Sequence, residues 1–212
     1  MNYFGHSAVA SWRSANGAVV LGAMLPDFAA MCGSRLADAE DPDVARGIAL
    51  HHATDAAFHT LPAVTALMRE LDGRLAELGC ARGPRRAVAH IGVELVLDGV
   101  LVDDASYRDS YLAGLAADLA GVRWRDDAGP ARFAVLIDRL RGYGVPDDLR
   151  DATSITQRLQ RILGHRPLLA PSHDDLRAIR TALIAIQPRV EVASDAVLRG
   201  VRAGLANLAH DA

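Results

Sequence analysis

The stretch Gly47-Ile-Ala-Leu-His-His-Ala-Thr-Asp-Ala-Ala-Phe-His-Thr-Leu-Pro62 decides the fold. Its spacing predicts a helix from about Pro42 to just before Pro62. Within this helix, His51, Asp55 and His59 recur at every fourth residue, so their side chains follow one stripe. Such polar groups are costly among aliphatic neighbours unless they are paired or bind a metal.

A second stripe with the same spacing lies in Ala87–Val102, where it consists of His90, Glu94 and Asp98. Two such helices packed together predict a mononuclear or dinuclear metal site, as helical bundles commonly build. Mixed imidazole and carboxylate ligation suits zinc, manganese or iron. We therefore predict metal ligands on both helices: His51, Asp55, His59, His90, Glu94 and Asp98.

Further ligands, a general base and a proton donor are predicted among these residues and their neighbours. His6 and Asp27 are the best ligand candidates outside the two helices. Asp27 or Glu94 would serve as general base, and His52 as proton donor, an alternative ligand or an exposed residue. The structural alternative is that the carboxylates only accept hydrogen bonds from the histidines. Against it, Glu94 and Asp98 have few polar neighbours in their helix, and carboxylates are rarely buried unpaired.

Apolar residues recur at three- and four-residue steps through most of the chain, which predicts an all-α, single-domain helical bundle over residues 1–212. Asp27 is expected at a turn, because Pro26 follows an apolar helix. The one hint of a strand, at residues 190–193, is very short. The expected helices span about 3–12, 17–24, 42–60, 62–79, 84–101, 104–120, 130–142, 149–163, 172–186 and 188–208.

Composition excludes several classes of function. A net charge of −3 favours neither nucleic-acid binding nor a basic membrane surface. The longest apolar stretches fall short of the roughly 18 residues that a membrane span needs. The first residues lack the pattern of a signal peptide, and the two cysteines have no metal or redox spacing. A cytoplasmic location is expected.

The basic residues are all arginines, because the chain contains no lysine. Arg82, Arg85 and Arg86 directly precede the second stripe, where a helix N-terminus already favours anions. They are candidates for docking a phosphate or an acidic partner protein, and the alternative is a solvated loop. The chain lacks a Walker loop, a dinucleotide fingerprint and a Gly-x-Ser-x-Gly elbow. A metal-activated water is therefore the nucleophile that the sequence favours.

Several motifs together resemble the acyl carrier protein phosphodiesterase family. They are His6, Gly22-x-x-x-x-Asp27-Phe28, Gly47-Ile-x-Leu-His51-x-x-x-Asp55 with Pro62 after it, and Leu97-Asp98. A looser likeness continues into Ile155–Leu163 and Arg166-Pro-Leu168. The resemblance implies an all-helical, HD-domain-like fold and manganese-dependent removal of 4′-phosphopantetheine from the serine of holo-acyl carrier protein. It implies metal or catalytic roles for His6, Asp27, His51, Asp55 and Asp98.

The chain departs from the family pattern at several positions. The family usually has Arg at His52, Asp at Glu94 and His at Gly99, and its pattern lacks His59 and His90. The helix with His51 and His59 also looks like zinc-dependent phospholipase C-type proteins. Two alternatives to the carrier-protein substrate follow: hydrolysis of another phosphoester, such as a nucleotide or a phospholipid head group, and a non-catalytic helical scaffold.

Overall fold

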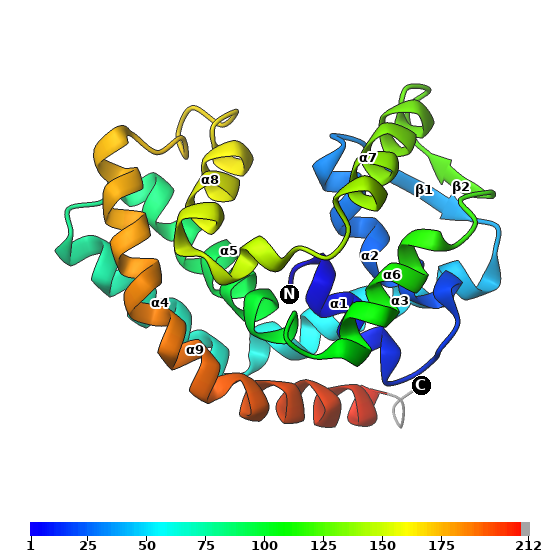
Figure 1. The fold of residues 1–212 in the computed structure, drawn as a ribbon, viewed down its shortest axis with the longest axis horizontal. Coiled ribbons are helices and arrows are strands. Elements are labelled where there is room, and N and C mark those ends of the chain that lie inside the picture. Colours follow the sequence, from blue (N-terminus) through cyan, green and yellow to red (C-terminus); the bar gives the residue numbers. More distant parts are fainter. Residues whose placement is uncertain (209–212) are drawn as a thin grey trace. The chain divides into compact units, whose positions relative to one another are not determined.

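The computed structural model describes residues 1–208, and its elements are almost all helices (Figure 1). The predicted all-α bundle is confirmed. The chain divides into two compact units: unit 1 comprises Met1–Ala56 and Leu101–Pro146, and unit 2 comprises Ala57–Val100 and the residues from Asp147 onward. The assignment of residues 1–212 to one domain stays a prediction. Among the helices of the described chain, none combines the length and the hydrophobicity needed to cross a membrane.

Unit 1 is built around two apolar N-terminal helices. Helix α1 packs against α2 and α6, and α2 also packs against α7. Its core contains Phe4, Leu21, Met24, Phe28 and Tyr111, all fully buried. The elements of unit 1 are α1 (Tyr3–Ser11), α2 (Gly17–Met31), β1 (Leu36–Ala39), α3 (Pro42–Thr60) up to Ala56, α6 (Ala105–Ala116), β2 (Val122–Trp124) and α7 (Gly129–Tyr143).

Two short strands that the sequence did not reveal lie next to α7. Strands β1 and β2 pair antiparallel, with Leu36 opposite Trp124 and Ala39 opposite Val122 (Figure 1). The ring of Trp124 packs on Phe133 of α7, with centroids 4.9 Å apart. The strands are anchored to unit 1 through this aromatic contact.

Unit 2 packs α9 against α4 and α8. Its core contains Phe58, Leu71, Leu75, Leu95 and Leu97. The elements are the last turn of α3 from Ala57, α4 (Pro62–Glu77), α5 (Arg82–Leu101) up to Val100, the short 3₁₀ helix η1 (Asp147–Arg150), α8 (Ala152–Leu163) and α9 (His173–Leu208).

Helix α9 is one helix, so the expected break between residues 186 and 188 is wrong, whereas residues 190–193 are helical, in agreement with the expected helix over 188–208. Proline removes one backbone donor and bends a helix without necessarily ending it. Buried Leu183, Ile186 and Val190 continue the apolar stripe across Pro188, which outweighs the local cost. Figure 1 shows α9 changing direction partway along its length.

Helix α2 likewise continues through Pro26, so Asp27 lies inside a helix and not at the expected turn. A proline in a helix interior costs about 3 kcal/mol. Burial of Phe28 and Ala29 in the core, just beyond the proline, offsets that cost. Asp27 therefore has a position fixed by regular helical geometry.

Helices α2 and α3 cross with their backbones in contact. A Cβ atom on Gly22 would lie 2.1 Å from the carbonyl oxygen of Val44, and one on Gly47 would lie 2.2 Å from that of Val19. Only glycine permits such an approach, since real Cβ atoms essentially never come within 3.0 Å of another heavy atom. The crossing holds the part of α2 with Asp27 close to the part of α3 with His51.

Candidate metal centre

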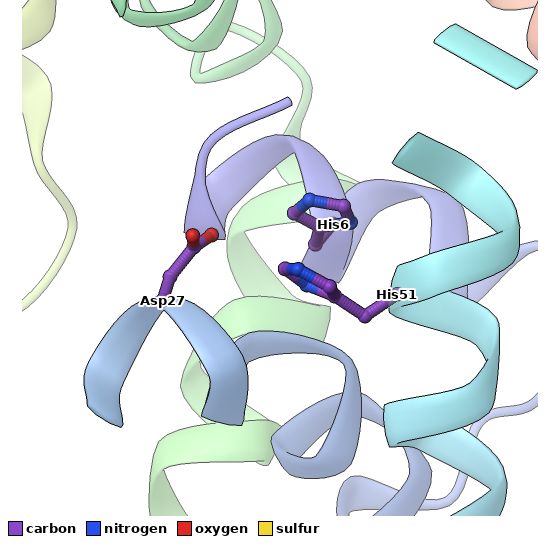
Figure 2. Close-up of side chains that lie close together, drawn as sticks. All are labelled: His6, Asp27 and His51. Carbon is purple, nitrogen blue, oxygen red and sulfur yellow. The ribbon is translucent and has the colours of Figure 1, made fainter. Parts of the chain in front are cut away.

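Three helices of unit 1 bring His6, Asp27 and His51 together. His6 comes from α1, Asp27 from α2 and His51 from α3, and Figure 2 shows their side chains converging. One ligand atom from each residue lies within 4.8 Å of the others. This group, called the inner group below, combines two imidazoles with one carboxylate.

His51 is oriented and kept neutral by its surroundings. Its ring is 5% exposed, and Nδ1 lies 2.9 Å from the carbonyl oxygen of Ala23. We assign the proton to Nδ1, which donates to that oxygen and leaves the Nε2 lone pair for a ligand. Burial, with the nearby charge of His6, lowers the pKa of His51 to about 3. The imidazole is therefore uncharged at neutral pH, as metal binding requires.

His6 is fixed in the same way from the other side. Its Nε2 lies 3.0 Å from the carbonyl oxygen of Met1 and 3.2 Å from Oδ1 of Asp55, so we assign its proton to Nε2 and its lone pair to Nδ1. Its ring stacks on that of His51 with centroids 3.8 Å apart. Both imidazoles thus have one nitrogen fixed as a donor and the other able to bind a metal.

Asp55 supports this arrangement as an ionised carboxylate. Burial alone would raise its pKa, but the hydrogen bond from His6 and the positive charge of the Met1 amino group hold that pKa well below its usual range. The Met1 nitrogen lies 2.7 Å from Oδ1, and Nε2 of His51 lies 3.6 Å from Oδ2. Asp55 therefore contacts both histidines of the inner group.

The donor set of the inner group fits a divalent transition metal. Two imidazoles and a carboxylate are ligands that manganese, zinc and iron accept. A buried histidine with its second nitrogen bound to a carbonyl or a carboxylate is the usual arrangement around such ions. The residues present thus match the metal that the sequence predicts.

A groove in unit 1 lies beside the inner group. It has a volume of about 650 Å³, and Pro26, Ile48 and His52 line it together with Arg35–Ala39. Pro26 and His52 are the direct neighbours of Asp27 and His51 in the chain. His52 is exposed and lies edge-on to His51, with ring centroids 5.3 Å apart. The sequence did not predict the wall formed by β1, because its four residues, Leu-Ala-Asp-Ala, are too few for a clear strand pattern.

The remaining predicted residues divide as follows. His59, Glu94 and His90 form a second group within unit 2, again with ligand atoms within 4.8 Å of one another. Burial would raise the pKa of Glu94, but the hydrogen bond from His90 and the charges of His90 and His59 lower it. Asp98, a fully buried carboxylate on α5, stays a predicted ligand. The first stripe is thus divided between the two groups, with His51 in one and His59 in the other, because residues four apart drift about 40° around a helix.

The three arginines take different positions at the start of α5. Nε of Arg85 lies 2.9 Å from Oδ1 of Asp72 and so ties α5 to α4. Arg82 and Arg86 are exposed. Docking of an anion by these residues stays a prediction.

Gly99, where the resemblance led us to expect a histidine, lies against the backbone of η1. A Cβ atom on Gly99 would lie 2.2 Å from the carbonyl oxygen of Leu149 in η1. The backbone of η1 therefore occupies the space in which any side chain at position 99 would begin.

Comparison with protein-family models gave one match, to the model described as acyl carrier protein phosphodiesterase, over residues 1–189. Neither the comparison with curated proteins nor that with solved structures found a match. The matched residues include the inner group, the groove and the second group.

Proposed function

Because the chain belongs to the acyl carrier protein phosphodiesterase family, we propose that it is a metal-dependent hydrolase that removes 4′-phosphopantetheine from holo-acyl carrier protein. The family implies a hydrolase, and Mn²⁺ is the metal that we propose. The convergence of His6, Asp27 and His51 in the inner group is the observation that supports metal dependence.

The inner group would hold the ion through His6, Asp27 and His51. Asp55 adds a carboxylate next to both histidines. Asp98 is a further ligand proposed from the family pattern alone. When bound, the ion supplies Lewis acidity at the phosphoryl oxygen and lowers the pKa of a water molecule.

Two side chains of unit 1 are placed to move protons. A carboxylate has two oxygens, so Asp27 has one for the ion and one to accept a proton from the attacking water. His52 faces the groove and is exposed, and we propose that it gives a proton to the departing serine oxygen. These two roles place the base and the acid on α2 and α3.

The groove is the proposed site for the phosphopantetheine arm. Its volume falls within the range of small-ligand sites in proteins, roughly 300–1,000 Å³. Arg35 is an exposed residue that lines the groove, and a guanidinium binds phosphate oxygens in a bidentate manner. We propose that Arg35 binds the phosphate of the arm.

The experiment is incubation of the protein with holo-acyl carrier protein and Mn²⁺, followed by intact-mass measurement of the carrier protein. We expect conversion to the apo form. His51→Gln and Asp27→Asn should each lower kcat/KM by roughly 100-fold or more, since each removes a ligand or the proton acceptor. His165→Gln is the matched control, because His165 is exposed and remote in sequence from every candidate residue.

Two outcomes would contradict the proposal. An unchanged carrier-protein mass, beside turnover of a generic phosphodiester, would replace the substrate with another phosphoester. Full activity after exhaustive chelation, or in His51→Gln, would show that the reaction does not depend on a metal at the inner group.

A further inference from the structure

The second group lies apart from the residues to which the proposed reaction assigns a role. His59 is in the last turn of α3, and His90 and Glu94 are one turn apart on α5. All three belong to unit 2. Neither histidine is among the residues that carry the family resemblance. From its geometry we propose that His59, His90 and Glu94 form a second metal site, selective for zinc-like transition metal ions.

The spacing of the ligand atoms fits a metal better than it fits hydrogen bonds alone. Nε2 of His59 and Nε2 of His90 lie 3.6 and 3.3 Å from the same oxygen, Oε1 of Glu94. Charge-assisted N–H···O bonds are shorter, about 2.7–2.9 Å. Ligands bound tetrahedrally at about 2.1 Å from a zinc ion are separated by about 3.4 Å. The two measured separations lie on either side of that value.

The two imidazoles are neighbours at this group. Their rings are stacked, with centroids 4.8 Å apart and planes 21° from parallel. Both Nε2 atoms approach one carboxylate oxygen, and a rotation of the two exposed rings about their side-chain torsions would turn both lone pairs toward a shared ion. Two protonated imidazoles stacked in this way would repel each other, whereas two neutral ones would share a cation.

Exposure gives an ion a route in, and ligand chemistry selects which ion. The side chains of His59 and His90 are 34% and 52% exposed, while that of Glu94 is 10% exposed. Two nitrogens and one oxygen leave a fourth tetrahedral position for water. Such a set favours Zn²⁺, Co²⁺ or Ni²⁺ over Mg²⁺ and Ca²⁺, which prefer oxygen ligands.

An ion at this site would join two helices distant in sequence. It would tie the end of α3 to the middle of α5, and binding to the folded state alone stabilises that state. At a hundredfold excess of Zn²⁺ over Kd, the melting temperature should rise by roughly 5 °C.

The test measures Zn²⁺ stoichiometry by equilibrium dialysis of chelator-treated full-length protein, with excess Mg²⁺ present. We expect two equivalents in the wild type and one in His90→Gln. His51→Gln should also bind one equivalent, now at the second group alone. In that protein, Co²⁺ should give the visible absorption of a tetrahedral nitrogen and oxygen site, and adding His90→Gln should abolish it. Circular dichroism verifies folding, and Glu94→Gln supplies a second, isosteric variant.

The outcomes separate this site from the proposed reaction. The second site is overturned if His51→Gln binds no Zn²⁺, or if neither His90→Gln nor Glu94→Gln lowers the stoichiometry. It stands if both lower it by one equivalent, even where holo-acyl carrier protein is left unchanged. His165→Gln, which replaces an exposed histidine outside both groups, should retain two equivalents.

Discussion

The inner group and the second group have the same composition, two histidines and a carboxylate, but differ in their surroundings. His6 and His51 are 1% and 5% exposed, and backbone carbonyl oxygens fix one nitrogen of each. The side chains of His59 and His90 are 34% and 52% exposed. Three helices build the inner group, whereas α5 alone supplies two members of the second.

The difference in burial indicates which group is suited to a reaction and which is suited to metal binding alone. Rigid, dry ligands with fixed tautomers hold an ion in one geometry, which a reaction requires. Exposed ligands exchange an ion with solvent and keep more rotamer freedom. Pro26 and His52, the neighbours of Asp27 and His51 in the chain, also line a groove. We therefore propose that the same residue types serve a reaction in the inner group and stabilisation in the second group.

The largest effect should come from the α2–α3 crossing that positions the inner group. Gly47→Ala would drive Cβ against the backbone of α2, 2.2 Å from the carbonyl oxygen of Val19. Overpacking of two rigid helices should lower the free energy of unfolding by about 3 kcal/mol. Urea unfolding of metal-free protein measures this loss, and Mn²⁺ titration measures the expected weakening of the inner group.

The matched control is Gly73→Ala on α4, where a Cβ atom would meet nothing within 4 Å. Alanine is the better helix former, so this variant should gain about 0.5–1 kcal/mol. If Gly47→Ala were as stable as the wild type, the close crossing of α2 and α3 would not be what positions Asp27 and His51.

An intermediate effect should appear in the pH dependence of stability. The pKa of His51 is about 3 in the folded protein and about 6.5 in the unfolded chain. Below pH 6.5, His51 therefore binds a proton in the unfolded chain but not in the folded protein. The free energy of unfolding falls as the pH falls. Between pH 7.5 and 4.5, metal-free wild type should lose about 2 kcal/mol more than His51→Gln.

Urea unfolding at both pH values measures that difference. His165→Gln should behave as the wild type does, because its ring is exposed. Equal pH dependence in wild type and His51→Gln would mean that the inner histidine is not kept neutral by burial.

The smallest effect should come from Gly99→Ala on α5, the helix of the second group. Its Cβ would lie 2.2 Å from the carbonyl oxygen of Leu149, but that oxygen belongs to a four-residue 3₁₀ turn. A short turn yields more easily than a long helix, so the loss should be about 1 kcal/mol. Thermal unfolding of Gly99→Ala and Gly47→Ala compares the two losses of stability. A larger loss in Gly99→Ala than in Gly47→Ala would contradict the prediction.

The spacing of apolar residues predicted the helices. Contacts between helices determined which residues form the inner group and the second group. The helix from Pro42 to Thr60 and its stripe of His51, Asp55 and His59 followed from spacing alone. The stripe could not show that His51 would join His6 while His59 would join His90. Those pairings depend on how α1 and α5 pack, which no local pattern encodes.

The errors have a common physical cause. Proline predicted an end to α2 at Pro26 and a break in α9 at Pro188, yet both helices continue. Burial of residues beyond each proline outweighed the local preference. The ion pair between Arg85 and Asp72 was likewise not predicted, because it depends on how α4 and α5 pack.

The close approach of η1 to Gly99 also constrains how this chain can change over generations. Any side chain at this position must displace the Leu149 backbone, and a large one must displace it further than alanine does. Changes in the turn at 147–150 that make room should therefore raise the tolerance of position 99 for larger residues.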